Sequence, residues 1–456
     1  MRSVVCVRIG RDGELGPFDA CAYEAALTLG GEVILLSMCP EGDSDALLKL
    51  TRLGACRAVL LSDKAFAGAD TLATAYTLSL VIKKLSPDLV FCGRQTMIGD
   101  TAQTGVMLAS LAGLNPLTGV MSIDKVDKTV TVTTREEGSV EANLPALLTV
   151  ERINTLRLPR LRSRLGELEV WSAADLAADI QRCGLLGSPT RVVKTFENES
   201  GKRRCKFIKR SELDEIIRSA LASKKAAVLE RNETQKLVQG TVISVTEAPL
   251  EMAKTICDNP KVIPLLSPAS IAEIIKEEKP RAVIFGSDSK SKRISAQLAA
   301  EMSLGLCADC TALEYDGSEV YMYRPALSGT VIAKIKSLST PALATVRTKS
   351  DSLADITVAI GYGVKDSLPR AYQFAKDLGA TVATTRKMTD NGITPYELQV
   401  GLTGKTVAPP VYIALGVSGA VHHIVGMQRS GTVIAVNPDK NAPIFDYADY
   451  GVLEEF

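Results

Sequence analysis

Short apolar runs alternate with longer stretches of helical spacing along the first part of the chain. An apolar run at residues 3–9 precedes a helical pattern over 18–29, and a second apolar run follows at 32–37. Strands separated by helices in this way are typical of βαβ units built on a parallel sheet. The same alternation predicts helices over 43–53 and 70–85 and strands at 58–61 and 89–92.

A glycine-bearing loop follows the predicted strand at 89–92 directly. Ligands of open α/β sheets bind beyond the carboxyl ends of the strands, so this loop is well placed for a nucleotide. Its polar residues include the donors Thr101, Gln103 and Thr104 and the acceptor Asp100. The candidate nucleotide residues are Gly93, Gln95, Asp100, Thr101, Gln103, Thr104 and Gly105.

The remaining pattern divides the chain into further α/β segments. Alternating residues over 122–134 predict a hairpin, and the charged stretch that follows the first domain contains one helical segment at 211–223. Later strands are expected at 282–285, 356–360, 381–384 and 411–415. We expect a first domain over 1–195, an arm and linker over 196–235, a second α/β domain over 236–354 and a third over 355–456.

Charge and composition narrow the classes of protein. The 53 Lys and Arg residues balance 52 Asp and Glu residues, so no global field favours nucleic acid or an anionic membrane. Neither a signal peptide nor an apolar run long enough to span a bilayer is recognisable. These features predict a cytoplasmic protein with no membrane span and no nucleic-acid partner.

The ten cysteines do not form a metal-binding pattern. Only Cys307 and Cys310 make a CxxC pair, and both histidines lie elsewhere in the sequence. A zinc site needs about four ligands, so no metal site is predicted. For the pair itself, a structural role and a redox dithiol both stay open.

Two adjacent histidines, His422 and His423, are the only histidines in the chain. Histidine titrates near neutral pH, so the pair is a candidate functional feature, although a buried, hydrogen-bonded core histidine is an equal alternative. The nearby 401–406 segment is no phosphate loop, because Gln399 stands where its first glycine belongs. Gly361-Tyr-Gly363 likewise lacks the third glycine of a dinucleotide fingerprint.

Several sequence segments together carry a family resemblance. The C-terminal part contains QVGLTGKTVAP, SGAVHH and APIFDYADYG in order; LGLCADCT and YRPALSG precede them, and CGRQTMIGDTAQTG lies in the first domain. The chain resembles the electron transfer flavoproteins, with a beta-subunit-like region followed by an alpha-subunit-like region. The resemblance implies an α/β fold with two flavodoxin-like or nucleotide-hydrolase-like parallel-sheet domains and one Rossmann-like FAD-binding domain.

The resemblance also implies an FAD site in the third domain. In such proteins, positive or hydrogen-bonding groups stabilise the negative charge that develops near N1 and the C2 carbonyl of the flavin. Arg386, Thr403 and His423 match the residues that lie beside the flavin ring. The full set of expected FAD contacts is Tyr362, Thr385, Arg386, Val400, Gly401, Leu402, Thr403, Ser418, Gly419, Ala420, Val421, His422, His423, Asn437, Asp449 and Tyr450.

Some residues depart from the family pattern. Tyr362 stands where an arginine is common, Leu402 replaces a frequent glutamine before the ring-facing threonine, and Thr385 replaces a serine. In the first domain, Gly16 replaces an asparagine, and Met38-Cys39 replaces Cys-Gly.

Three functions follow from the resemblance as alternatives. The first is an electron carrier whose FAD receives electrons from a partner dehydrogenase, acyl-CoA dehydrogenase-like or other, and passes them to a second redox partner. Leu161, in an arginine-rich segment, is the candidate docking residue. The others are an NADH-oxidising, electron-bifurcating flavoprotein with two FAD, and a non-redox adenine-nucleotide-binding protein. The first-domain ligand is accordingly AMP or a second FAD.

Overall fold

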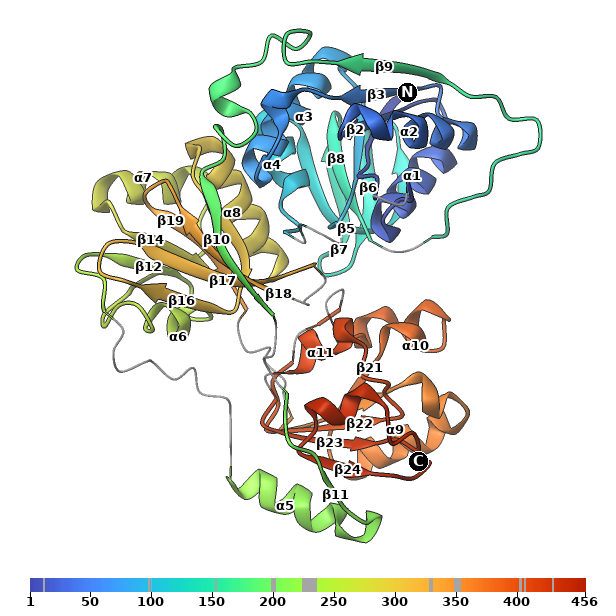
Figure 1. Cartoon of the computed structure of the whole chain (residues 1–456), viewed down its shortest axis with the longest axis vertical. Coiled ribbons are helices and arrows are strands. Elements are labelled where there is room, and N and C mark those ends of the chain that lie inside the picture. The colour runs from blue at the N-terminus through green and yellow to red at the C-terminus, as the bar shows by residue number, and fades with distance from the viewer. Residues whose placement is uncertain are drawn as a thin grey trace. The chain divides into compact units, whose positions relative to one another are not determined.

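The computed structural model divides into two compact units (Figure 1). It describes residues 1–456 except 11–12, 97–98, 100, 152–153, 198–201, 224–235, 328–330, 348–353, 402–403, 406 and 429. Unit 1 comprises residues 1–194, 234–324 and 333–346, and unit 2 comprises residues 195–233, 325–332 and 347–456.

The first part of unit 1 is a nine-stranded sheet, parallel in its centre. The edge formed by β5, β6 and β7 is antiparallel, which agrees with the hairpin predicted from the alternating pattern. In spatial order the strands are β7 (Gly138–Asn143), β6 (Thr129–Thr134), β5 (Asn115–Val126), β8 (Ala146–Val150), β4 (Leu89–Gly93), β1 (Arg2–Cys6), β2 (Glu32–Met38), β3 (Arg57–Leu61) and β9 (Glu167–Trp171).

Helices cover both faces of this sheet, so its central strands are buried on both sides. Alternate side chains therefore enter different cores: Val4 packs with one cluster and Val5 with the other. Asp70 caps the longest of these helices by accepting from the N–H groups of Leu72 and Ala73, each at 3.0 Å. The helices are α1 (Pro17–Leu29), α2 (Ser44–Leu50), α3 (Thr71–Leu85) and α4 (Thr104–Ala112).

The second part of unit 1 contains a five-stranded sheet and three helices. Every strand pair in this sheet is parallel. The strands, in order, are β13 (Lys261–Ile263), β12 (Val242–Val245), β14 (Ala282–Phe285), β19 (Ala342–Val346) and β15 (Leu306–Cys310), with helices α6 (Leu250–Ala253), α7 (Pro268–Glu278) and α8 (Ser289–Met302).

A separate four-stranded sheet marks the places where the chain passes between the units. The unit boundaries at residues 194, 324 and 332 fall inside three of its strands. In spatial order it consists of β10 (Thr190–Glu197), β18 (Val331–Ser337), β17 (Val320–Ala326) and β16 (Ala312–Tyr315).

Unit 2 is built on a six-stranded parallel sheet. Its central strands, rich in Val, Ile and Ala, are fully buried between helices, as the apolar runs at 356–360 and 411–415 predict. The strand order is β11 (Lys206–Phe207), β24 (Tyr450–Val452), β23 (Thr432–Val436), β22 (Val411–Leu415), β20 (Ile356–Ile360) and β21 (Thr381–Thr384). Its helices are α5 (Leu213–Ser223), α9 (Leu368–Asp377), α10 (Arg386–Asp390) and α11 (Val421–Met427).

The segment expected as an arm contributes both a strand and a helix to unit 2. Strand β11 pairs with β24, where Lys206 lies opposite Tyr450. On α5, Leu213, Ile217 and Ala220 lie three and four residues apart and bury one helix face in the unit 2 core.

The fold class predicted from the sequence is confirmed at the level of an α/β protein with several parallel-sheet domains. None of the helices within the described residues is long and apolar enough to cross a membrane.

The two CxxC cysteines are buried free thiols. The Cys310 thiol donates to the Cys307 carbonyl oxygen at 3.3 Å, within strand β15. Burial raises the pKa of Cys310 well above its usual value, which disfavours the reactive thiolate. This environment favours the structural role.

We expect the Ile217→Ala variant to lower the stability of unit 2 by about 2–5 kcal/mol, because it removes buried apolar volume from the α5 contact. Hydrogen exchange in peptides from β22 and β23 measures this loss. The single tryptophan, Trp171, lies in unit 1, so its fluorescence reports whether the mutation leaves that unit folded. Ser219→Ala, on the exposed face of α5, is the matched control. Equal exchange in both variants would contradict a stabilising role for the arm.

Candidate functional site

The carboxyl edge of the unit 2 sheet contains a topological switch point. Strand β20 lies between β21 and β22, which are the next two strands along the sequence. Loops after β20 and β22 therefore leave in opposite directions. Open α/β sheets bind ligands at such a switch point.

The loops after β20 and β22 contact each other through their backbones. The Gly361 N–H donates to the Leu415 carbonyl at 2.8 Å, and the Gly363 N–H donates to the Gly416 carbonyl at 3.1 Å. A Cβ atom on Gly361 would lie 2.2 Å from the Gly416 carbonyl oxygen, and Gly416 has a φ of +58°. Both positions therefore require glycine, and the two loops present bare backbone to a ligand.

The loop before α11 packs against other parts of unit 2 through its backbone, and three of its predicted ligand contacts are exposed. Gly419 has a φ of +90°, and a Cβ there would lie 2.1 Å from the Ile444 nitrogen. Asn437 fastens the same region, because its amide donates to the Val417 carbonyl at 3.0 Å while its carbonyl accepts from the Asp439 N–H at 2.9 Å. The predicted contacts Ser418, Ala420 and Val421 are exposed above this support.

A second loop, the 399–405 turn, lies against α11. The Val400 N–H donates to the Thr384 carbonyl at 3.0 Å, and the Gly401 N–H donates to the Lys405 carbonyl at 3.0 Å. Gly401 has a φ of +141°, and a Cβ there would lie 2.6 Å from the His422 carbonyl oxygen. The turn thus packs on the helix through its backbone. Leu402 and Thr403 lie outside the described residues.

The adjacent histidines have different environments. The His423 ring is 5% exposed, and its nitrogens lie 3.1 Å from the Val400 carbonyl oxygen (Nδ1) and 2.9 Å from the Tyr412 hydroxyl (Nε2). Burial lowers the pKa of His423 to about 4. His422 is half-buried; burial lowers its pKa too, and its Nε2 has no hydrogen-bond partner among the described residues.

Polar and cationic groups also follow β21. Thr385 precedes α10, and its buried hydroxyl has no hydrogen-bond partner within the described part of the chain. The next residue, Arg386, pairs with Asp390 at 3.3 Å across one helical turn. The Tyr362 ring lies 4.1 Å from the Lys387 ammonium and 4.9 Å from the Lys365 ammonium. The tyrosine that departs from the family pattern is therefore flanked by two cations.

Asp449, expected at the adenosine end of the site, is engaged by the arm. Its carboxylate accepts from the Val433 N–H at 2.8 Å and forms an ion pair with Arg203. Arg203 also donates to the Ser430 carbonyl at 2.6 Å and the Gly431 carbonyl at 2.5 Å. Tyr450, the next residue, begins β24 beside β11. In this structure Asp449 therefore joins the arm to the sheet edge.

The first-domain loop predicted to bind a nucleotide also lies at the carboxyl end of its strand. Gly93 ends β4, and a Cβ there would lie 2.4 Å from a carboxylate oxygen of the buried Asp19. The pKa of Asp19 is raised to about 7, because the effect of burial exceeds the opposing effect of its backbone hydrogen bonds. The Gly99 carbonyl accepts from Arg324 at 2.9 Å, within unit 1. Gln95 and Thr101 are half-buried, and Asp100 lies outside the described residues.

A pocket in unit 1 opens beside this loop. Gln103 is only 1% exposed, and neither its amide nitrogen nor its carbonyl oxygen has a hydrogen-bond partner among the described residues. Thr104 begins α4, where Gly105 packs against Thr149. Glu151 is almost fully buried and faces Arg94 at 3.2 Å. The other charged groups that line the pocket are Arg135, Glu136, Glu137, Lys292 and Arg293.

Sequence patterns identified the two loops but not these lining residues. Arg94 and Glu151 directly follow the observed strands β4 and β8, and a polar residue after an apolar run is a signal that could have been used. Lys292 and Arg293 come from α8, almost 200 residues away, and no local pattern connects them to the loop. Gly416 directly follows the predicted strand at 411–415, but it is not among the candidate site residues that the sequence predicts.

Known proteins resemble this chain over its beta-subunit-like region and its alpha-subunit-like region. Residues 3–176 and 264–360 match the electron transfer flavoprotein domain, and residues 352–428 match the electron transfer flavoprotein FAD-binding domain. Protein FixA of Azorhizobium caulinodans is 44% identical over 203 residues, which cover 40% of this chain and 72% of FixA.

Both kinds of electron transfer flavoprotein subunit occur among the relatives. The beta subunit of Clostridium acetobutylicum is 38% identical over 205 residues, covering 42% of this chain and 79% of the subunit. The alpha subunit of Thermoanaerobacterium thermosaccharolyticum is 33% identical over 230 residues, covering 40% of this chain and 70% of the subunit. The chain belongs to the electron transfer flavoprotein family and fuses beta and alpha regions in one polypeptide.

Proposed function

We propose that the protein accepts electrons from a partner dehydrogenase on FAD bound in unit 2 and passes them to a second redox protein. The observation that carries this proposal is the close backbone contact of Gly361 with Gly416 at the switch point of the unit 2 sheet. Both glycines lie within the segment that matches the family's FAD-binding domain. Two buried polar atoms, Thr385 Oγ1 before α10 and His422 Nε2 in α11, have no hydrogen-bond partner among the described residues.

The residues of unit 2 fit the parts of an FAD molecule. The exposed Ser418, Ala420 and Val421 lie before or at the start of α11, where backbone N–H groups favour a diphosphate. Lys365 and Lys387, beside Tyr362, supply positive charge near the same edge. Asn437 and Asp449 act by fixing the loop and the strand at the adenosine end.

Bound FAD supplies the redox centre, and the chain supplies its surroundings. Arg386 and Thr403 are proposed to lie beside the flavin ring, where a cation and a hydroxyl favour added negative charge. Arg386 is restrained by Asp390, so its guanidinium has a defined position at the start of α10. On either side of Thr403 in the sequence, Val400 contacts Thr384, and Gly401 contacts Lys405 and α11.

The unit 1 pocket supports a second nucleotide, AMP or FAD. The buried Gln103 carboxamide, whose donor and acceptor have no partner among the described residues, is suited to the edge of a base or flavin ring, which presents the complementary pair. Arg135, Lys292 and Arg293 supply cations for phosphates. This pocket favours, as a second candidate function, an electron-bifurcating flavoprotein that oxidises NADH and holds two FAD.

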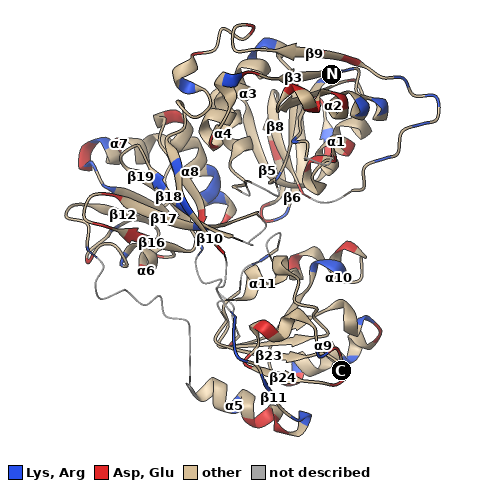
Figure 2. Cartoon of the chain, viewed as in Figure 1, with Lys and Arg blue, Asp and Glu red and all other residues tan. Residues whose placement is uncertain are grey.

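An arginine-rich segment between β8 and β9 is the proposed partner surface (Figure 2). Leu161 and Leu158 are almost completely exposed, and Arg160, Arg162 and Arg164 are exposed around them. Apolar anchors among cations suit an acidic partner with a small hydrophobic pocket. We propose a flavin dehydrogenase, acyl-CoA dehydrogenase-like or other, as that partner.

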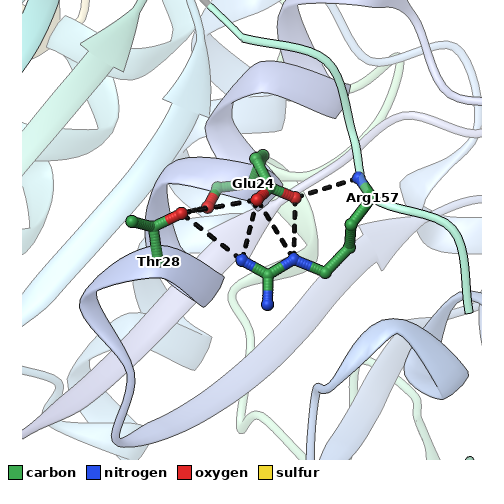
Figure 3. A network of polar contacts seen from close by, with 3 residues as sticks. All are labelled: Glu24, Thr28 and Arg157. Atoms are coloured by element: carbon green, nitrogen blue, oxygen red, sulfur yellow. Dashed lines mark hydrogen bonds and ion pairs between the residues drawn. The ribbon is translucent and has the colours of Figure 1, made fainter. Parts of the chain in front are cut away.

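One end of this segment is fastened to α1. The Arg157 guanidinium forms a two-pronged ion pair with Glu24, with Nη2 to Oε1 at 2.7 Å, and the Arg157 N–H donates to Oε2 at 3.0 Å (Figure 3). Thr28 adds a hydroxyl contact to the same carboxylate at 3.4 Å. The hydrogen bond from the Arg157 side chain lowers the pKa of Glu24. The Glu24 carboxylate therefore stays ionised, and the ion pair stays formed, when the pH equals the usual pKa of a glutamate. The ion pair is lost when the pH falls through the lowered pKa of Glu24.

Purified protein should show a flavin visible spectrum and release FAD on denaturation. Asn437→Ala should weaken FAD binding about tenfold or more, because it frees the Val417 loop. Titration of FAD into the flavin-free protein measures this change. Asn441→Ala, exposed on the same connection, is the control. The site assignment is wrong if both variants bind FAD as the wild type does.

The second nucleotide is tested by counting AMP and FAD per chain. One FAD with AMP supports the simple carrier, and two FAD support bifurcation. In either case we expect Gln103→Leu to lower occupancy of the unit 1 site about tenfold and to leave the unit 2 FAD bound, because the apolar isostere cannot pair with a ring edge. Gln181→Leu, at an exposed position, controls for the added apolar side chain. A variant that retains its full AMP or second FAD would exclude Gln103 as a contact.

The fastening of the partner segment is tested by limited trypsin digestion. Glu24→Gln should speed cleavage after Arg160, Arg162 and Arg164 several-fold, because the segment loses a charged hydrogen-bonded anchor. The exposed Glu41→Gln variant is the control. Unchanged cleavage would show that Glu24 does not restrain the segment.

A further inference from the structure

Two lysine side chains converge on one aromatic ring at the carboxyl edge of the unit 2 sheet. The Lys387 ammonium lies 4.1 Å and the Lys365 ammonium 4.9 Å from the centroid of the Tyr362 ring. Tyr362 and Lys365 belong to the segment that directly follows β20, whereas Lys387 follows the neighbouring parallel strand β21. The ring therefore gathers cations from two adjacent loops.

The two lysines have no ion-pair partner among the described carboxylates. Asp390, three residues after Lys387, pairs with Arg386 instead. The ammonium nitrogens of Lys365 and Lys387 can be no farther apart than their two distances from the ring taken together, which is about one Debye length at physiological salt. Because like charges at this separation repel each other, a bound anion would stabilise the arrangement.

The ring itself has a defined position. On one side of Tyr362, the Gly361 N–H donates to the Leu415 carbonyl at 2.8 Å, and on the other the Gly363 N–H donates to the Gly416 carbonyl at 3.1 Å. The ring is partly buried and packs against the hydrophobic core of unit 2. Lysine side chains that lie on this fixed ring lose less conformational entropy when they bind an anion.

A buried hydroxyl close to Lys387 in sequence also lacks a described partner. Thr385 Oγ1, two residues before Lys387, is buried and has no hydrogen-bond partner among the described residues. The Thr385 N–H donates to the Ile360 carbonyl at 3.1 Å, which joins the loop after β21 to the end of β20. A buried hydroxyl without a partner costs free energy that a ligand atom can recover. The hydroxyl and the two charges both indicate a bound oxyanion.

We propose that Tyr362 is a positioning residue that holds Lys365 and Lys387 together as a cation site for the diphosphate of the unit 2 ligand. This inference rests on the proposed FAD site. Tyr362 stands where an arginine is common in the family, so the positive charge absent at this position is supplied by the two lysines on its ring. The lysines attract the phosphate oxygens, and Tyr362 fixes the ammonium groups.

Binding of ADP and of adenosine to the flavin-free chain tests the cation site, because the two ligands differ only in the diphosphate. The ligand concentration that protects residues 356–364 from hydrogen exchange measures binding at this site separately from the unit 1 pocket. We expect Lys387→Gln to weaken ADP binding about fivefold, and the change of Lys365 and Lys387 together to weaken it about tenfold or more. Adenosine binding should stay within about twofold in both variants. Lys376→Gln, at an exposed position of α9, is the matched control.

Substitutions of Tyr362 test its positioning role. Tyr362→Phe keeps the aromatic face, so ADP should bind within about twofold of the wild type. Tyr362→Leu keeps an apolar side chain without the ring, so ADP should bind about threefold more weakly. In the variant that lacks both lysines, the same leucine should have no further effect, because the ring acts only through the ammonium groups.

The FAD-loaded protein supplies a second readout. FAD affinity should fall less steeply with added salt in the variant that lacks both lysines than in the wild type. Wild-type affinity for ADP in that variant would overturn the proposal, as would equal loss of ADP and adenosine, which indicates a structural defect. An effect of Tyr362→Leu that persists without the lysines would overturn the positioning role. If the wild type binds no FAD, the proposed function fails, whereas lysine-dependent protection by ADP would still support the cation site.

Discussion

The loops of unit 2 depend on one backbone contact, between the segments that follow β20 and β22. Parallel strands bring their carboxyl ends to one edge, and here the following peptide groups approach until Gly361 has no room for a Cβ beside Gly416. The contact fixes the two loops relative to each other without any side chain. The surrounding support, including Asn437 below the α11 loop and the His423 contact to the 399–405 turn, positions the remaining loops relative to this glycine pair.

Much of the fold could be predicted because local physics and tertiary packing agree. The run at 89–92 is apolar because strand β4 is covered on both faces, and the helix from 71 to 85 begins at an Asp70 cap that the sequence displays. Strand β11 could not be predicted in this way. It is two residues long, has no measurable period, and is defined by β24, which follows more than 240 residues later.

Prediction of the site was limited for the same reason. Glycines after strands and adjacent polar residues are visible in sequence, so two loops at the carboxyl ends of strands could be proposed as nucleotide sites. The partners that decide a side chain's role are not visible: Asp449 is matched by Arg203, and Gln103 shares its pocket with residues of α8. Assignment of individual ligand contacts therefore stays a prediction, whereas family membership rests on matches across most of the chain.

The arm has a consequence for how the gene can be divided. Residues 195–233 belong to unit 2, although residues of unit 1 precede and follow them in the sequence. If the polypeptide were cut after α5, the edge strand β11 and the helix α5 would belong to one chain and the rest of the unit 2 sheet to another. Completion of that unit would then become a bimolecular equilibrium that dilution reverses. In the continuous chain it is independent of protein concentration, and the two halves are always made in equal number.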